Sequence, residues 1–333
     1  MKKKSEIAVL GDGGWGTTLA VLLSNKGYPV TLWGAFPEYS DRVARTRSNP
    51  KFLPGVIIPR SVTVTADLRE AVAQKDIIVL AVPSEYLRGV LKGLAPSGYP
   101  RQAHYVSVTK GIEMGSLKRM SEVIREELGQ VPLAVLSGPT IAHELARGIP
   151  TTAVIASHDS GIRKELQAVF MTGRFRVYTN DDVAGVELGG SLKNIIAIAC
   201  GISDGLGFGS NTKAALLSRG LVEMARLGSA MGARQHTFSG LSGLGDLVTT
   251  CVSPHSRNRF VGEQIGKGKT LRQVIAHMQM VAEGVPTTKS AYALSKKYGV
   301  DMPITREIYS VLYKNKSPLK AVKDLMTRQG KEE

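Results

Sequence analysis

Cysteines and long hydrophobic runs are scarce in this chain of 333 residues. Cys200 and Cys251 are its only cysteines, too few for a disulfide framework or a cysteine-based zinc site, so we expect a reducing compartment, the cytoplasm. The longest apolar runs, such as 77–82 and 195–200, are far shorter than the ~20 residues of a membrane-spanning helix. The lysines at 2–4 precede a brief apolar stretch that leads into a glycine-rich loop instead of a cleavage site, which argues against a signal peptide. We therefore expect no membrane span.

Patterns for binding metal or nucleic acid are also missing. His143, His236 and His255 form no cluster at metal-ligand spacing, so we expect no bound metal. Lysine and arginine number 43 against 28 acidic residues, a formal net charge of +15, yet they are scattered, with no basic stripe interleaved with aromatic residues. We expect no nucleic-acid partner. The charge indicates a solvated basic surface or the attraction of small anions such as phosphorylated substrates.

A glycine-rich loop near the start of the chain is the most informative motif. Residues 11–16 read Gly-Asp-Gly-Gly-Trp-Gly, after a short apolar strand and before an apolar helical stretch, and a second strand is expected at 28–33. In such a loop Gly11 permits a tight turn, Gly13 lets the backbone approach a pyrophosphate, and Gly16 packs helix against strand. An ordinary glycine-rich turn is the alternative, but the strand-loop-helix context favours a dinucleotide-binding, Rossmann-type unit.

Length and periodicity predict two domains. Up to about residue 180, apolar strands alternate with helical stretches, the pattern of a parallel sheet covered by helices on both faces. We expect an α/β, Rossmann-like domain over residues 1–182. Its further strands are predicted at 61–65, 77–82, 104–108, 133–136, 153–156 and 176–178, and its helices at 68–74, 85–94, 118–128 and 162–170.

The remainder, residues 183–333, is expected to form an all-α domain, because strand-like runs stop and helical periodicity takes over. Gly299 is expected to end one helix, and Pro303 and Pro318 to begin two others. A helical domain over the carboxyl ends of the strands would close a substrate site, so we expect the chemistry between the halves. Helices are predicted at 186–199, 213–231, 260–266, 271–278, 287–298, 305–314 and 319–327.

Four more segments are unusual for core elements. They are Ser-Val-Thr-Lys-Gly-Ile-Glu at 107–113, Ser-Gly-Pro-Thr-Ile-Ala-His-Glu-Leu at 137–145, Glu-Leu-Gly-Gly-Ser-Leu-Lys-Asn at 187–194, and Gly-Leu-Ser-Gly-Leu-Gly-Asp-Leu at 240–247 with Ser-Arg-Asn-Arg at 256–259. With the glycine loop, they resemble bacterial NAD(P)-dependent glycerol-3-phosphate dehydrogenase from about residue 7 to 325. The resemblance implies an oxidoreductase that interconverts dihydroxyacetone phosphate and glycerol 3-phosphate, which feeds phospholipid synthesis. It also implies a homodimer, as in many members.

The resemblance further implies the catalytic and substrate-binding residues. Lys193 would give the proton in reduction and take it in oxidation, Lys110 would be a second cation at the same oxygen, and Asp246 would orient Lys193 or a substrate hydroxyl. A lysine suits this task, because hydride transfer to a ketone leaves negative charge on an oxygen that must be stabilised and protonated. The segment at 256–258, taken alone, could be a solvated turn. The other implied substrate contacts are Gly138, Thr140, Ser256, Arg257 and Asn258, with Arg257 as the phosphate clamp.

The cofactor is expected to be NAD or NADP. After the second strand, an acid would hold the ribose hydroxyls of NAD, or a basic side chain the phosphate of NADP, but this chain has Ala35 and Phe36 there. Arg42 or Arg45 could still reach a phosphate and Glu38 could favour NAD, so the preference stays open. The resemblance implies cofactor contacts at Gly11, Gly13, Gly14, Trp15, Gly16, Ala35, Lys110, Ala142, Arg257, Val281 and Glu283.

Two glycines precede Lys193 on the same helix face. Gly189 and Gly190 each cost ~1 kcal/mol in a helix relative to alanine, which suggests that something must come close. We interpret them as bare backbone that substrate and nicotinamide approach. The alternative is tight helix packing beside a surface lysine. Asn194 is expected to brace a neighbouring loop.

Two other functions remain open. A β-hydroxyacid dehydrogenase or a ketopantoate-type reductase would share the fold and a lysine-asparagine pairing on a helix, but a carboxylate substrate does not need the segment at 256–258. A non-catalytic protein that senses nucleotides or binds nucleic acid would fit the basic charge. No helix-turn-helix or RNA-binding signature supports that reading.

Overall fold

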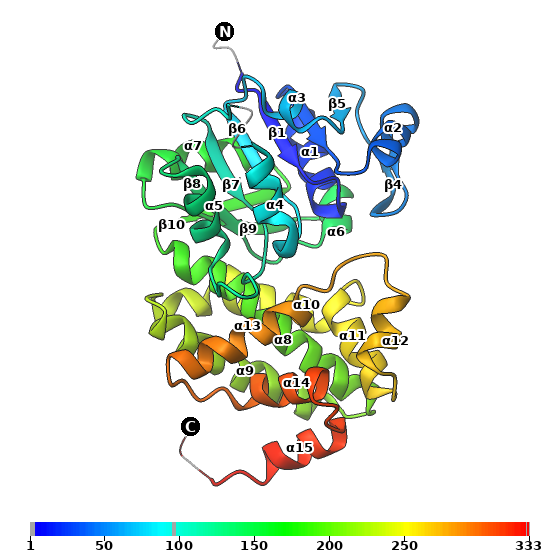
Figure 1. Ribbon diagram of the computed structural model, residues 1–333, viewed down its shortest axis with the longest axis vertical. Coiled ribbons are helices and arrows are strands. Elements are labelled where there is room, and N and C mark those ends of the chain that lie inside the picture. The colour runs from blue at the N-terminus through cyan, green and yellow to red at the C-terminus, as the bar shows by residue number, and fades with distance from the viewer. Residues whose placement is uncertain (1–3, 95–97, 331, 333) are drawn as a thin grey trace. The chain divides into compact units, whose positions relative to one another are not determined.

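An eight-stranded sheet organises the first half of the chain in the computed structural model, which describes residues 4–94, 98–330 and 332 (Figure 1). The lysines at 2 and 3 lie outside the described residues. The chain divides into two compact units. The sheet unit comprises residues up to Lys110 and Lys118–Glu187, and the helical unit comprises Gly111–Leu117 and Leu188–Glu333. The expected domain boundary between residues 182 and 183 stays a prediction.

The strands follow the order β10-β9-β8-β7-β6-β1-β2-β5, and every expected strand is present. Their apolar side chains alternate between two buried clusters, so helices cover both faces, as expected. In β1, Ile7 and Val9 pack on one face, and Ala8 and Leu10 on the other. The bounds are β1 Ile7–Leu10, β2 Val30–Trp33, β5 Val62–Thr65, β6 Ile77–Leu80, β7 His104–Ser107, β8 Leu133–Ser137, β9 Thr151–Ala156 and β10 Phe175–Asn180.

One pairing departs from the parallel expectation. β9 runs antiparallel to β8, with Val135 opposite Ala156, and β10 runs parallel to β9. The connection from β8 to β9 holds only the helix α6 (Ala142–Ala146), which has five residues. Five helical residues rise about 7.5 Å, whereas five strand residues span about 16 Å. Helix α6 is therefore too short to return the chain for a parallel strand.

Helices form a layer on each face of the sheet. α1, α6 and α7 contribute to one buried cluster, and α3, α4 and α5 to the other. Missing from the sequence prediction are α6, the helix α2 (Pro37–Thr46) and the short pair β3 (Ser48–Asn49) and β4 (Leu53–Ile57). α2 is mainly polar and buries only two residues, so it lacks the apolar content by which the other helices were detected. The other bounds are α1 Gly14–Asn25, α3 Leu68–Val72, α4 Ser84–Leu94, α5 Met120–Leu128 and α7 Ser160–Phe170.

A long apolar helix, α8 (Val183–Gly205), begins in the sheet unit and continues as the core of the helical unit. By length and composition it could cross a membrane, but 94% of its most apolar window is buried within the protein, as in a core helix. The described part of this unit is helical, as expected. The other elements are α9 Ser210–Ala230, the 3-10 helix η2 Gln235–Ser239, the π-helical segment η3 Leu241–Gly245, α10 Asp246–Val252, α11 Arg257–Gly266, α12 Leu271–Ala276, α13 Gly284–Lys297, α14 Pro303–Tyr313 and α15 Pro318–Met326.

Several helix ends match their sequence signals. Gly299 follows α13 with φ +65°, a backbone conformation that favours glycine. Pro303 and Pro318 are the first residues of α14 and α15, as expected. Proline suits this position because its missing N–H has no partner within the helix.

Helices α8 and α11 meet at glycines. A Cβ on Gly201 would lie 2.0 Å from the carbonyl oxygen of Arg259, and a Cβ on Gly262 would lie 2.1 Å from that of Ile198. The two backbones are therefore in contact, and no side chain could be inserted between them. This packing fixes α11, which begins at Arg257, against the helix that carries Lys193.

Candidate active site

The glycine loop makes the turn from β1 into α1. Gly11 has φ +119°, and a Cβ there would lie 2.7 Å from the carbonyl oxygen of Ala81, so the turn requires glycine. A Cβ on Gly16 would lie 1.9 Å from the carbonyl oxygen of Gly11, which shows how closely α1 packs on the loop. Gly13 differs, because a Cβ there would meet nothing within 4 Å. This open space is what the close approach of a pyrophosphate requires.

The start of α1 suits an anion. Gly13 is the N-cap, no side chain accepts a hydrogen bond at this helix start, and the first turn contains no acidic residue. Free N–H groups and the positive end of the helix dipole attract negative charge. The loop therefore fits the pyrophosphate of NAD or NADP.

Asn49 holds the glycine loop in place, and sequence analysis missed it. The residue is fully buried, and its Nδ2 donates to the backbone carbonyl oxygen of Asp12 at 2.6 Å and to Thr17 Oγ1 at 2.8 Å. Its Oδ1 accepts a hydrogen bond from the Tyr39 hydroxyl at 2.7 Å. A single buried asparagine gives no signal of its own in the sequence. Its hydrogen bonds fix the carbonyl of the loop, which supports the conformation that leaves Gly13 open.

Three further expected cofactor residues lie around the same helix start. A Cβ on Gly14 would lie 2.6 Å from the carbonyl oxygen of Phe52 and 3.7 Å from the Cβ of Ala142, so α1 and α6 are neighbours here. Trp15 packs edge-on against Phe175, with ring centroids 6.4 Å apart. The Trp15 Nε1 is buried and has no hydrogen-bond partner among the described residues. The structure thus brings Gly14 and Ala142 together.

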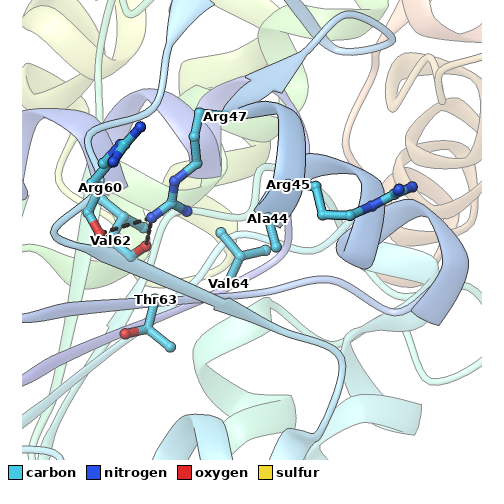
Figure 2. A pocket seen from close by; sticks show the side chains of 7 residues that line it. All are labelled: Ala44, Arg45, Arg47, Arg60, Val62, Thr63 and Val64. Atoms are coloured by element: carbon cyan, nitrogen blue, oxygen red, sulfur yellow. Dashed lines mark hydrogen bonds between the residues drawn. The ribbon is translucent and has the colours of Figure 1, made fainter.

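Ala35 is exposed just after β2, and the arginines considered for an NADP phosphate, Arg42 and Arg45, both lie on α2. Arg45 lines a hollow of about 540 Å³ with Arg47 and Arg60 (Figure 2). The hollow adjoins Val62, Thr63 and Val64 of β5, and β5 runs parallel to β2, which Ala35 follows. Arg47 donates to the Val62 carbonyl oxygen at 3.0 Å, and Figure 2 shows the Arg45 side chain pointing away from that guanidinium. The lining of this hollow does not include Ala35 or Phe36.

Three expected substrate residues meet in the sheet unit. Lys110 Nζ donates to the carbonyl oxygen of Gly138 at 2.9 Å and to Thr140 Oγ1 at 3.4 Å. They meet because β7 and β8 are parallel neighbours, so the segments that follow them leave the same edge of the sheet. Gly138 has φ +137°, and a Cβ there would lie 3.0 Å from Ala153 Cα. The turn that positions the acceptor for Lys110 therefore requires glycine.

Lys193 and Asp246 form a buried ion pair in the helical unit. Their side chains are 8% and 3% exposed, and Lys193 Nζ lies 2.8 Å from Asp246 Oδ1. Thr250 Oγ1 accepts from the same Nζ at 2.5 Å and donates to the backbone carbonyl oxygen of Asp246 at 2.7 Å. A buried ammonium needs such partners to offset its lost hydration. The pair therefore holds the lysine in one defined position.

Thr250 is a second residue that sequence analysis missed. It follows Asp246 by four positions, so both lie on one face of α10. That spacing is a signal the sequence contains. It becomes informative only once Lys193 is known to lie against this face.

Gly189 has a different role from the one expected. A Cβ on Gly189 would lie 2.7 Å from the carbonyl oxygen of Ser242, within η3. The glycine thus allows η3 to pack against α8, and η3 runs directly into α10, whose first residue is Asp246. The interpretation of Gly189 as bare backbone for substrate is wrong, and tight packing explains it. The same contact brings Asp246 to Lys193.

The segment at 256–258 is the start of α11, which begins earlier than the sequence predicted. Ser256 is the N-cap, and its Oγ accepts a hydrogen bond from the Arg259 N–H at 3.2 Å. Arg257 is the first helical residue and is exposed. A helix N-terminus with an exposed guanidinium suits a phosphate better than a solvated turn would.

Asn258 joins three helices. Its Nδ2 donates to Asn194 Oδ1 at 2.8 Å, and its Oδ1 accepts from the Gly284 N–H at 2.8 Å. Asn194 lies on α8 and Gly284 begins α13. Asn194 therefore braces a neighbouring segment, as expected. Asn258 positions the start of α11 in addition to any contact with substrate.

The remaining expected cofactor residues lie between α12 and α13. The negative charge of Glu283 acts on Arg257, which places these two residues near each other. Just before Val281, residues 278–280 line a hollow of about 220 Å³ that Ser256 and Arg257 also line. Among the described residues, no group of three histidine, cysteine or acidic side chains could hold a metal ion. Cys200 and Cys251 are both buried free thiols.

Comparisons with known proteins agree over the whole chain. Residues 6–162 match the family model for the N-terminus of NAD-dependent glycerol-3-phosphate dehydrogenase, and residues 182–323 match the model for its C-terminus. The chain is 54% identical over 330 residues to the glycerol-3-phosphate dehydrogenase (NAD(P)+) of Prosthecochloris aestuarii, covering 98% of this chain and 99% of the relative. It is 50% identical over 332 residues to a glycerol-3-phosphate dehydrogenase (NAD(P)+) of Salinibacter ruber, and the match covers 99% of this chain and 97% of the relative. The crystal structure of glycerol-3-phosphate dehydrogenase from Coxiella burnetii is similar, with a TM-score of 0.94 and 41% sequence identity. The match covers 98% of this chain and 99% of that chain.

Proposed function

The chain belongs to the NAD-dependent glycerol-3-phosphate dehydrogenase family, and from this premise we propose how its residues carry out the reaction. Its activity is the reversible, NAD(P)H-dependent reduction of dihydroxyacetone phosphate to sn-glycerol 3-phosphate. When bound, the reduced nicotinamide supplies the hydride for the ketone carbon. The protein must bind the phosphate, orient the ketone and move one proton.

Lys193 moves that proton in our proposal. The buried Lys193–Asp246 pair is the observation that carries this assignment. As the carbonyl oxygen gains negative charge, the Lys193 ammonium stabilises it and then gives it a proton, and in the reverse direction Lys193 takes the proton back. Asp246 and Thr250 orient the ammonium, so the donor does not have to be positioned during the reaction.

Lys110 provides a second positive charge for the same oxygen, and its bonds to Gly138 and Thr140 support this role. Gly138 and Thr140 line the substrate beside it. At the phosphate end, Arg257 makes the main contact, with the Ser256 hydroxyl and the Asn258 amide beside it. The N-terminal N–H groups of α11 add to the attraction for the phosphate.

The cofactor lies against the glycine loop in this proposal. Gly11, Gly13, Gly14, Trp15 and Gly16 surround its pyrophosphate, and the uncapped start of α1 supports this placement. The remaining proposed contacts are Ala35, Lys110, Ala142, Arg257, Val281 and Glu283.

The cellular compartment, the oligomeric state and the use of the product are also proposals. We place it in the cytoplasm, where free thiols persist, because both cysteines are free and buried. We propose that it acts as a homodimer, which sedimentation analysis of the purified protein tests directly. Its product then supplies the glycerol phosphate backbone for phospholipid synthesis.

An initial-rate assay tests the activity. Dihydroxyacetone phosphate is offered with NADH or NADPH, and oxidation of the cofactor is followed. Dihydroxyacetone without phosphate and ketopantoate serve as comparison substrates. We expect rapid reduction of dihydroxyacetone phosphate and little reduction of the other two, because the proposed site binds a phosphate. Reduction of ketopantoate without reduction of dihydroxyacetone phosphate would overturn the proposal in favour of a hydroxyacid-type reductase.

A further inference from the structure

One oxygen of a carboxyl group inside the glycine loop lacks a hydrogen-bond partner among the described residues. Asp12 is 8% exposed, and its Oδ2 is buried with no hydrogen-bond partner among the described residues. Buried polar atoms without partners are rare in native proteins, and each one calls for an explanation. The backbone of Asp12 is held firmly, because its carbonyl oxygen accepts hydrogen bonds from Thr17 Oγ1 at 3.1 Å and Asn49 Nδ2 at 2.6 Å. The unpaired oxygen therefore belongs to a residue whose backbone is fixed in the loop.

The Asp12 side chain points toward the end of β2. A Cβ built on Gly34, the residue that directly follows β2, would lie 2.5 Å from Asp12 Oδ2 and 2.5 Å from Ser40 Oγ. Ser40 is 1% exposed, and its hydroxyl also has no hydrogen-bond partner among the described residues. Gly34 thus leaves room for two unpaired polar groups at one place.

This place has a known purpose in dinucleotide-binding folds. An acidic residue at the end of the second strand accepts hydrogen bonds from the ribose hydroxyls of NAD, whereas NADP needs a cationic group for its 2′-phosphate. The end of β2 in this chain offers neither kind of side chain, because Ala35 and Phe36 stand there. Arg45 lines a hollow along the neighbouring strand β5, and the lining of that hollow does not include Ala35 or Phe36 (Figure 2).

We infer that Asp12, assisted by Ser40, supplies the missing ribose acceptor and makes NAD the preferred cofactor over NADP. This inference rests on the proposed function, because it assigns one end of the same cofactor. The carboxylate accepts hydrogen bonds from the adenosine ribose, and the Ser40 hydroxyl adds a second partner. With NADP, the 2′-phosphate would meet a buried negative charge, and close like charges repel strongly where water is excluded.

The electrostatic surroundings of Asp12 include one cation. Burial raises the pKa of Asp12, and a hydrogen bond from its own backbone N–H and the charge of Lys51 oppose this effect. The raised pKa means that the protein stabilises the Asp12 carboxylate less well than water does. A ribose hydroxyl would supply a hydrogen bond that the protein does not provide.

Binding and rate measurements with Asp12→Asn test the inference. Asparagine keeps the size of the side chain and removes its charge. We expect wild-type protein to bind NADH about 10- to 100-fold more tightly than NADPH by titration calorimetry, the range of a hydrogen bond to a charged group. Asp12→Asn should reduce this ratio by at least about 10-fold, and the ratio of kcat/KM values for the two cofactors should fall in parallel. Asp41→Asn is the matched control, because it removes an exposed carboxylate from the residue after Ser40 and should leave the ratio unchanged.

A second variant keeps the inference testable if Asp12→Asn fails to fold. Ser40→Ala removes only a hydroxyl and should reduce the NADH to NADPH binding ratio by about 2- to 10-fold, the range of a neutral hydrogen bond. Equal or tighter binding of NADPH by the wild-type protein would overturn the inference, as would an unchanged ratio in a folded Asp12→Asn variant. Failure to reduce dihydroxyacetone phosphate with either cofactor would count against the proposed function instead. The ratio of the two Kd values would still decide the role of Asp12.

Discussion

Gly13 in the sheet unit and the packed glycines of the helical unit serve different purposes. In the sheet unit, Gly13 leaves open space beside the start of α1, where a ligand can approach the main chain. In the helical unit, Gly201 and Gly262 let α8 and α11 meet backbone to backbone, and Gly189 lets η3 reach α8. Gly13 therefore exposes backbone to a ligand, whereas these three glycines of the helical unit bring helices together and so position side chains.

This difference matches the two tasks of the enzyme. Binding a pyrophosphate needs several N–H donors and little else, so a bare loop at a helix start is sufficient. Moving a proton needs one side chain held in a defined place. Lys193 meets this need, because Asp246 and Thr250 fix it from a helix that Gly189 brings close. The comparison predicts that substitutions in the helical unit change chemistry or stability, whereas substitutions in the loop change cofactor affinity.

Lys193→Met should have the largest effect. Methionine fills a similar volume but can neither donate a proton nor stabilise the oxyanion. We expect kcat to fall by about 10²- to 10⁴-fold, the usual contribution of a general acid-base group, with the Kd for NADH unchanged. Steady-state rates and calorimetry measure the two quantities. Lys213→Met is the matched control, because Lys213 also pairs with an acid, Asp204, but on the outer part of this unit, and it should retain the wild-type kcat. Wild-type turnover in Lys193→Met would show that Lys193 does not transfer the proton.

Gly201→Ala should have the next largest effect, on stability. The new methyl group would lie 2.0 Å from the carbonyl oxygen of Arg259, so α8 and α11 must move apart. Overpacking of this kind costs about 1–3 kcal/mol in the free energy of unfolding, more than alanine's helix propensity returns. Denaturant unfolding measures this loss of stability as a midpoint lower than that of the wild type.

The same substitution in the sheet unit serves as the control for Gly201→Ala. Gly89 lies exposed within α4, and a Cβ there would meet nothing within 4 Å. Gly89→Ala should stabilise the protein by about 0.5–1 kcal/mol, since only the helix propensity changes. Equal midpoints for the two variants would contradict the packing role assigned to glycine in the helical unit.

Gly13→Ala should change affinity instead of stability. Gly13 has φ −61° and ψ 172°, which alanine adopts without strain, and the space beside it is open. We therefore expect an unfolding midpoint close to wild type but a Kd for NADH raised by at least about 10-fold, because the methyl group occupies the space the pyrophosphate needs. Gly11→Ala in the same loop should destabilise the protein as well, since Gly11 has φ +119°. Wild-type NADH affinity in Gly13→Ala would place the pyrophosphate elsewhere.

The sequence predicted the features that depend on local pattern. Strands such as β1 and β6 are runs of apolar residues, and the turn at Gly11 follows from a motif that is complete within six residues. The grouping of Lys110 with Gly138 could be expected, because both follow adjacent parallel strands. These signals need no knowledge of which distant segments touch.

The sequence could not reveal contacts that depend on tertiary packing. The helix-breaking cost of Gly189 was visible, but its cause, the carbonyl oxygen of Ser242, lies more than fifty positions away in the chain. Asn49 and Thr250 are ordinary polar residues until the loop and the lysine that they contact are in place. The turn of β9 against β8 depends on the shortness of α6, which has too few residues to give a periodic pattern.

Buried carboxylates extend the comparison to pH. Burial raises the pKa of Glu187 in the sheet unit and of Glu223 in the helical unit. Glu187 is paired with Arg119 at 2.7 Å, whereas the donors to Glu223 among the described residues are neutral: the Ile304 and Thr305 N–H groups and the Thr305 hydroxyl. Burial raises the pKa of Glu223 to about 7. The folded state therefore binds this proton more tightly than the unfolded state, whose pKa is about 4.5. The contribution of Glu223 to stability is complete below pH 4.5 and is lost as pH rises to about 7.

Glu223→Gln should remove this pH dependence and is the smallest effect we expect. One proton changes the free energy of unfolding by at most about 1.4 kcal/mol per pH unit. Between pH 4.5 and 7, the free energy of unfolding should therefore fall more steeply with pH in the wild type than in the variant, by up to this amount. Denaturant unfolding at several pH values measures both slopes. Thr305→Val is the control, because it removes one hydrogen bond to Glu223 but keeps the carboxyl group, so stability should fall while the slope remains. Identical slopes for wild type and Glu223→Gln would show that the folded state does not hold the Glu223 proton more tightly than the unfolded state does.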